Sequence, residues 1–170
     1  MTNPISRTIT FHKFLAKDDN ELNISFQNIK SLFSYIDGLS KTVMTMPPTI
    51  QCGFVEQEGQ YLCMRKVEIA SDRLFGILDY ARNDELPLIM HERETSPMQL
   101  PPNNFICEPT HFMLYDNGVL LMEWNNHGPK WSALEEYLRK ISPDCKDIQT
   151  IKSISTPRID LLHNYNFSSL

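Results

Sequence analysis

The sequence feature that most constrains the fold is an Asn117-Gly118 pair between two apolar stretches, 110–115 and 119–124. Asn-Gly between apolar runs is the strongest short signal for a β-hairpin, because both residues of the favoured two-residue turn need positive φ. The two stretches are mainly apolar on both faces, which is typical of strands covered on both sides. We therefore expect residues 110–124 to form an antiparallel hairpin in the middle of a sheet.

A two-residue turn also determines which residues of the hairpin face each other. It places Phe112 opposite Glu123, and it places His111 opposite Trp124. The side chains that we expect in the core of this hairpin are Phe112, Leu114, Leu121 and Met122.

The remaining pattern predicts one α+β domain over residues 1–170, with two main helices packed on a mostly antiparallel sheet. Apolar residues spaced three and four apart predict a helix over residues 22–36, with its cap among residues 18–20 and a left-handed stop at Gly38. A second helix is expected over residues 131–141. Further strands are expected at residues 6–16, 50–55, 61–70, 73–82 and 148–154.

The segment 83–109 differs from the rest of the chain. It holds five of the 11 prolines and predicts a loop with short extended pieces. A loop of this length in a compact domain is often functional, so we expect it to act as a covering flap.

The charge balance and the length of the apolar runs each argue against one class of function. The chain has 16 Lys and Arg against 21 Asp and Glu, a formal net charge of −5, so it lacks the positive field that coats nucleic acid. Nucleic acid stays a possible ligand only through a local site. No apolar run approaches the roughly 18 residues needed to cross a bilayer, so no membrane contact is expected. The first residues lack the apolar region of a signal peptide, which predicts a cytoplasmic protein.

Standard cofactor motifs are missing from the sequence. It has no Gly-rich phosphate loop, no Gly-x-Ser-x-Gly elbow and no His-Glu-x-x-His pair. The four cysteines include no Cys-x-x-Cys pair from which a zinc site is built. No cofactor or bound metal is therefore expected.

Polar residues gather at the open end of the predicted hairpin, where the two strands bring distant parts of the chain together. The residues entering and leaving it are Glu108, Thr110, His111, Glu123, Asn125, Asn126 and His127. Trp124 and Trp131 flank the bend after the hairpin, and we expect both to fill the core.

Two catalytic interpretations of this cluster are open. In the first, His111 and His127 act as general acid and base of a metal-free ribonuclease, with Glu123 as a third catalytic candidate. Lys130 or Arg82 would then stabilise the phosphorane charge. In the second, Glu108, His111, Glu123 and His127 hold a divalent ion, for which their side-chain types are suitable.

Two non-catalytic interpretations compete with them. The segment 128–130 leads into the second helix, whose free amides and dipole favour an anion. The binding candidates are then Glu108, Asn125, Asn126, Lys130 and Arg82. The alternative is purely structural: Glu123 and His111 satisfy backbone groups, and the two asparagines make turn bonds.

Several short motifs within residues 74–141 carry a resemblance to a known group of proteins. They are Leu86-Pro87, Pro97-Met98-Gln99-Leu100-Pro101, Glu108-Pro109-Thr110-His111-Phe112, Glu123-Trp124-Asn125, Gly128-Pro129-Lys130 and the stretch from Leu134 to Tyr137-Leu138. This pattern resembles uncharacterised bacterial proteins of abortive-infection or phage-defence type, in which such a strand and bend precede a helix. The resemblance carries no catalytic assignment, and it implies a stand-alone module or a subunit that acts with another protein.

We therefore expect an accessory or sensing subunit of a bacterial phage-defence system, which binds protein or nucleic acid through residues 108–130. Its partner would be another protein subunit of the same system or a second copy of the chain. One alternative is a small metal-independent ribonuclease-like toxin. Another is a homo-oligomeric structural component, which would use an apolar face of the hairpin left uncovered.

Overall fold

The computed structural model describes residues 8–17, 23–39, 48–57, 59–82, 86–91, 94–102, 104–142 and 147–152. Seven strands of this part of the chain form one sheet: β1 (Thr8–Lys17), β2 (Phe54–Gln57), β3 (Gln60–Ile69), β4 (Arg73–Arg82), β7 (Ile106–Tyr115), β8 (Val119–Trp124) and β9 (Asp147–Lys152). Their order is β2-β3-β4-β7-β8-β1-β9, and all neighbours run antiparallel. The predicted hairpin, β7 and β8, therefore lies inside the sheet, as expected.

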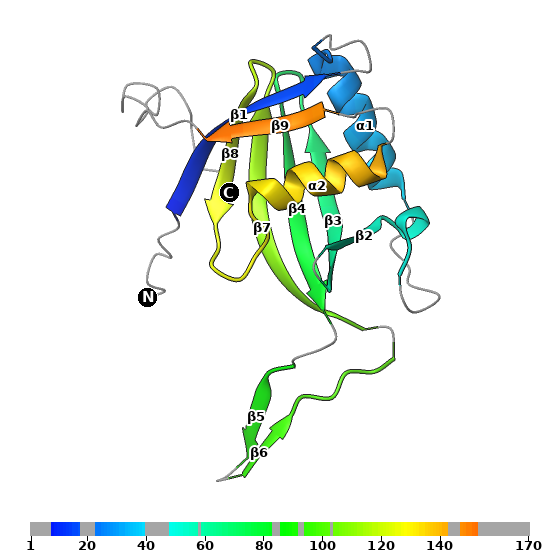
Figure 1. The fold of residues 1–170 in the computed structure, drawn as a ribbon, viewed down its shortest axis with the longest axis vertical. Coiled ribbons are helices and arrows are strands. Elements are labelled where there is room, and N and C mark those ends of the chain that lie inside the picture. The colour runs from blue at the N-terminus through cyan, green and yellow to red at the C-terminus, as the bar shows by residue number, and fades with distance from the viewer. Residues whose placement is uncertain are drawn as a thin grey trace.

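Two helices of the described residues, α1 (Phe26–Gly38) and α2 (Trp131–Ile141), lie on one side of the curled sheet (Figure 1). The first helix packs against β3, and the second packs against β2, β3 and β9. A short 3-10 helix, η1 (Ile50–Cys52), precedes β2. The predicted α+β class is confirmed, because helices cover one face of an antiparallel sheet.

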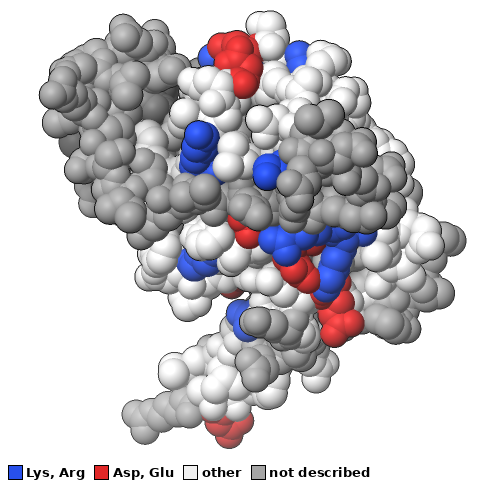
Figure 2. Space-filling view, turned by 45° about the horizontal axis from the view of Figure 1, so that its top comes forward, with Lys and Arg blue, Asp and Glu red and all other residues white. Residues whose placement is uncertain are grey.

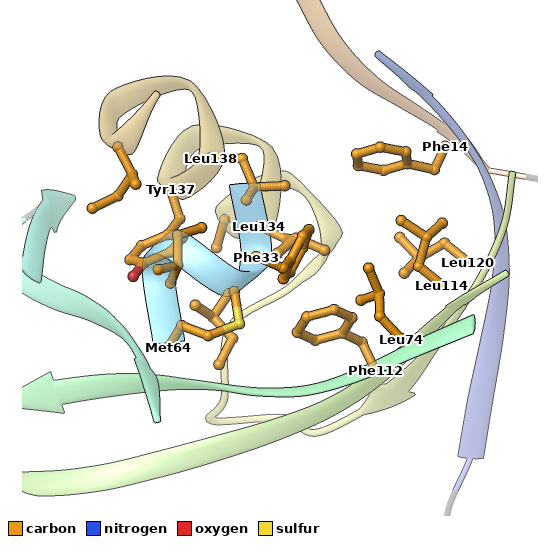
Figure 3. Close-up of a cluster of buried hydrophobic side chains, with 14 of the residues drawn as sticks. Phe14, Phe33, Met64, Leu74, Phe112, Leu114, Leu120, Leu134, Tyr137 and Leu138 are labelled. Atoms are coloured by element: carbon orange, nitrogen blue, oxygen red, sulfur yellow. The ribbon is translucent and has the colours of Figure 1, made fainter. Parts of the chain in front are cut away.

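The core fills the space between the helices and the sheet. Phe33 of α1 and Leu134 of α2 point toward Leu74 of β4 and Phe112 of β7 (Figure 3), and all four are buried. The four predicted core residues of the hairpin, Phe112, Leu114, Leu121 and Met122, are also buried.

The predicted register of the central hairpin is wrong by one residue. Phe112 lies opposite Met122, whereas a two-residue turn would have placed Glu123 opposite Phe112. The turn has three residues, 116–118, and its last residue, Gly118, has a φ of 80°. The Gly118 N–H donates to the Tyr115 carbonyl at 3.0 Å. Three-residue hairpin loops favour glycine at this left-handed position, so the Asn-Gly pair serves a longer turn than predicted.

The shifted register separates the hairpin side chains between two faces. Successive residues of a strand point to opposite sides, so Phe112 and Met122 face the helices and Leu121 faces away from them. We call the side without helices the outer face. The prediction of cover on both sides holds for the helix side only, because Ile9 and Val119 on the outer face are exposed.

The first helix begins and ends differently from the prediction. It starts at Phe26, and the Ser25 side chain caps it by accepting from the Asn28 N–H at 3.2 Å. Residues 18–20 and 22 lie outside the described residues. The chain before the cap is held extended, because the Ile24 N–H donates to the Ala16 carbonyl of β1 at 2.8 Å. Gly38 is the last helical residue and is not left-handed, so its predicted role as a stop is wrong.

The segment 83–109 contains more strand than predicted. It holds β5 (Leu88–His91) and β6 (Glu94–Pro97), which form a separate two-stranded sheet, and β7 already begins at Ile106. This hairpin projects beyond the end of the main sheet (Figure 1), so it is not a covering flap. We call its described residues, 86–91 and 94–102, the arm.

Candidate functional site

The bend between β8 and α2 is held by hydrogen bonds among its own residues. Asn125 Nδ2 donates to the Pro109 carbonyl at 2.7 Å, and Asn125 Oδ1 accepts from the His127 backbone N–H at 3.2 Å. Trp124 Nε1 donates to Asn126 Oδ1 at 3.0 Å. The two asparagines predicted to bind a ligand therefore shape the bend, as the structural alternative proposes.

The cation at the start of α2 also belongs to this bend. Lys130 Nζ donates to the Asn125 carbonyl and lies 4.5 Å from the centre of the Trp124 ring. Burial lowers the pKa of Lys130 below its usual value. Trp124 is 49% exposed, which corrects its predicted place in the core. Lys130 is therefore engaged by the Asn125 carbonyl and the Trp124 ring, and its charge is not directed at an anion, contrary to the prediction from the sequence.

Gly128 allows the bend to lie directly on β7. A Cβ at this position would stand 2.4 Å from Thr110 Oγ1, 2.8 Å from Asn125 Nδ2 and 2.9 Å from the Pro109 carbonyl oxygen. Only glycine fits so close to these atoms. The Gly-Pro-Lys motif therefore describes a tightly packed corner that leads into the helix.

The structure brings His111 and Glu123 together. His111 Nδ1 lies 2.6 Å from Glu123 Oε2, and the His111 backbone N–H donates to the same oxygen at 3.3 Å. The imidazole stacks on Phe75 of β4 with ring centroids 6.0 Å apart. This pair exists because the three-residue turn places both side chains on the outer face.

Arg82 and Glu108 lie on the opposite side of the sheet. Arg82 Nη2 is 3.6 Å from Glu108 Oε1, and both side chains are partly buried. Glu108 shares its face with Thr110 and Phe112, which lie two and four residues further along β7, whereas His111 points to the other face. The sheet therefore separates Arg82 and Glu108 from the imidazole, and Arg82 is not placed to stabilise a charge that forms there.

His127 does not complete the predicted catalytic pair. It is exposed on the bend, and its hydrogen bond to Asn125 is made by the backbone. Nowhere in the described part of the chain do three or more His, Cys, Asp or Glu side chains come close enough to hold a metal ion. The predicted group of Glu108, His111, Glu123 and His127 is thus divided among the two sheet faces and the bend.

Sequence reasoning missed an ion pair beside His111. Arg65 Nε donates to Asp79 Oδ2 at 2.8 Å, and Arg65 Nη2 donates to Asp79 Oδ1 at 3.3 Å. Asp79 is buried on the outer face of β4, and Arg65 sits in a β-bulge of β3. Burial raises the pKa of Asp79, and the hydrogen bond from Arg65 opposes this rise. A signal for the pair was present, because Asp79 interrupts an otherwise apolar strand.

These two pairs form a band of polar side chains across four strands of the outer face. We call Arg65, Asp79, His111 and Glu123 the outer band. Asp79 and His111 lie on neighbouring strands and interact electrostatically. A carboxylate bound to one imidazole nitrogen orients the ring and leaves the other nitrogen to exchange a proton. The outer band therefore offers one oriented imidazole, that of His111, whereas the sequence pattern assigned the acid and base roles to His111 and His127 together.

The arm presents the most exposed large apolar side chains of the described residues. Leu88 is 66% exposed and Met90 is 72% exposed, with Ile89 between them also exposed. An exposed apolar group on a projecting hairpin is a feature of interaction sites.

The charged side chains form no single large patch on the part of the surface seen in Figure 2. Acidic and basic side chains are interspersed there in small groups.

The chain matches no protein-family model, no curated protein and no solved structure. Within the described residues, there is also no helix that combines the length and the apolar character needed to span a membrane.

Proposed function

We propose that this protein is a cytoplasmic, protein-binding subunit that acts as an accessory or sensing component of a bacterial phage-defence system. The observation that carries the binding role is the arm, with Leu88, Ile89 and Met90 exposed in succession. A two-stranded hairpin is marginally stable alone, and exposed apolar residues on it gain stability when a partner covers them. The resemblance of residues 74–141 supplies the phage-defence context.

The contacts of the bend support a binding surface away from residues 108–130. Lys130 and Asn125 are bound to neighbours in the bend, and His111 is paired with Glu123. Groups that already satisfy one another gain little from a ligand. The arm instead offers exposed apolar side chains, so we place the binding surface on the arm and not on the bend at residues 108–130.

A phage challenge tests this function. The gene would be expressed with its native neighbouring genes in a bacterial host, and the efficiency of plating would be measured for a phage panel. We expect Leu88→Ser/Met90→Ser to raise plaque counts at least tenfold over wild type, without a change in melting temperature. Tyr35→Ser is the matched control, because Tyr35 is 59% exposed on α1, away from the arm. Full protection by the arm variant, or no protection by wild type, would contradict the proposal.

The second candidate function is a ribonuclease that uses the outer band. It is favoured by one observation, the 2.6 Å contact of His111 Nδ1 with Glu123 Oε2. In this case the purified protein should cleave a labelled RNA without added metal, and His111→Ala should abolish cleavage. Glu123→Gln should reduce cleavage, and His127→Ala should leave it unchanged because His127 lies outside the pair. Intact RNA after incubation with wild type would exclude this candidate.

A further inference from the structure

The hydrogen bonds of the arm show which of its backbone groups face outward. The Met98 N–H donates to the Pro87 carbonyl at 2.9 Å, which makes these two residues a bonded pair. Bonded and non-bonded pairs alternate along an antiparallel ladder. The next pair, Leu88 with Pro97, is therefore non-bonded, and so is the pair that contains Met90. Leu88 and Met90 consequently point their N–H and C=O groups to the outer edge of β5.

The two edges of the arm are not equivalent. The outer edge of β6 is formed by Thr95 and Pro97, and proline has no N–H to donate. The outer edge of β5 carries both donors and both acceptors of Leu88 and Met90. No other strand of the described residues pairs with either edge. An incoming strand would therefore find a complete set of backbone groups on β5 only.

The same two residues of β5 supply side-chain contacts. Leu88 and Met90 are two residues apart in a strand, so their side chains lie on one face of the arm. Both are more than half exposed. In strand addition, backbone hydrogen bonds supply affinity and alternate side chains supply specificity. The edge of β5 combines both features.

The sequence around β5 is acidic, which selects among partners. Of the 21 acidic and 16 basic side chains of the protein, four acidic and one basic lie in residues 83–102. A second copy would bring two acidic segments together, and phosphate groups of nucleic acid or an anionic bilayer would be repelled. A segment with Lys or Arg between apolar residues would be attracted.

We propose that β5 is a strand-addition site for an extended, basic and apolar segment of a partner protein. This proposal rests on the protein-binding function given above and specifies its mode and its ligand. The partner segment would pair with Leu88 and Met90 through its backbone. Its apolar side chains would cover theirs, and its basic side chains would interact favourably with the acidic segment of residues 83–102, which includes Glu94.

A peptide library is the probe that tests this proposal. Random 12-residue peptides displayed on phage would be selected on the wild-type protein, and the enriched peptides would be synthesised and titrated. We expect enriched peptides to alternate apolar residues with Lys or Arg, and Leu88→Ser/Met90→Ser to weaken their binding at least tenfold. Glu94→Gln should weaken binding about two- to threefold at low salt and less at high salt.

A pair of proline variants tests the edge itself. Met90→Pro removes the Met90 side chain and an outward N–H from β5 but leaves the bonds between β5 and β6 in place, so it is compared with Met90→Ala, which removes the side chain alone. Thr95→Pro removes an outward N–H on the β6 edge. We expect Met90→Pro to weaken peptide binding at least tenfold beyond Met90→Ala, and Thr95→Pro to change it less than twofold. Circular dichroism melting of both variants should match wild type, because the arm lies outside the core.

Other outcomes separate the proposal from the function on which it rests. Binding that depends on Leu88 and Met90 but responds equally to both proline variants would overturn strand addition and leave the protein-binding function in place. An arm-dependent dimer in light scattering, or arm-dependent sedimentation with phosphatidylglycerol vesicles, would overturn the basic partner. Selected peptides that bind equally to the Leu88→Ser/Met90→Ser variant would contradict both proposals.

Discussion

Nδ1 of His111 lies 2.6 Å from Oε2 of Glu123, across the neighbouring strands β7 and β8. This relationship depends on a single residue in the turn that joins the strands. With a two-residue turn, Glu123 would lie opposite Phe112 and its carboxylate would enter the apolar core. With the observed turn of residues 116–118, the carboxylate stays on the outer face, where it accepts two hydrogen bonds.

Glu123→Ala should therefore reduce stability. It removes the acceptor for the backbone N–H of His111 and for its ring, and we expect a loss of about 1.5–3 kcal/mol in the free energy of unfolding, as for a hydrogen bond to a charged group. Glu123→Gln should lose less, because its amide oxygen can still accept the backbone bond. Urea denaturation of the three proteins measures the difference. Equal midpoints for wild type and Glu123→Ala would show that the pair adds nothing to the fold.

The turn also explains which part of the hairpin could be predicted. Apolar runs on both sides of Asn117-Gly118 predicted two central antiparallel strands, and this prediction is correct. Strands made mainly of apolar residues are stable only where they are buried inside a sheet, so composition alone indicated their position. The register was not predictable from that pattern alone. Both faces are mainly apolar, so a shift of one residue leaves the apolar pattern almost unchanged.

Two adjacent leucines of β8 provide a test of the register. Leu120 faces the helices and is fully buried, whereas Leu121 faces the outer side and is 8% exposed. We expect Leu120→Ala to cost about 2–5 kcal/mol, as large-to-small substitutions in a closed core do. Leu121→Ala should cost less, because the half-exposed residues around it can relax and water can reach the site. A larger loss for Leu121→Ala in chemical denaturation would contradict the observed register.

Two glycines with opposite surroundings give a matched pair. Gly128→Ala would place its Cβ 2.4 Å from Thr110 Oγ1 and 2.9 Å from a backbone oxygen, which cannot move aside cheaply. We expect a loss of at least about 1–3 kcal/mol, as for other overpacked sites. Gly38→Ala meets nothing within 4 Å and lies in the last turn of α1, so it should be neutral or stabilise by up to about 1 kcal/mol. Thermal melting of both variants measures the contrast.

The candidate site was predicted less well than the fold, for a physical reason. Glu108, His111, Glu123 and His127 lie close along the chain, so the sequence suggested a single cluster. Alternate residues of a strand point to opposite faces, however, and Glu108 and His111 of β7 therefore lie on different sides of the sheet. Asp79 interrupts an apolar strand, but its partner Arg65 lies 14 residues away and reaches it through a β-bulge that the sequence pattern does not predict. The exposure of Leu88 and Met90 depends on the direction in which the arm leaves the sheet, and this is a property of the whole fold.

The ion pair of Arg65 with Asp79 predicts a pH-dependent mutational effect. Burial raises the pKa of Asp79 above its unfolded value, so folded protein keeps this proton to higher pH, and stability is lost as pH rises through the folded pKa. Arg65 limits this loss by its hydrogen bond to the ionised carboxylate.

Arg65→Met should therefore cost about 1–3 kcal/mol in the free energy of unfolding at pH 7, where Asp79 is left charged and without its partner. The cost should fall near pH 4, where Asp79 takes up its proton. Asp79→Asn in the Arg65→Met background should remove this pH dependence, because the amide does not titrate. Denaturation of wild type, Arg65→Met, Asp79→Asn and the double variant at both pH values measures the effect. A cost of Arg65→Met that is equal at pH 4 and pH 7 would show that the buried charge of Asp79 is not what Arg65 stabilises.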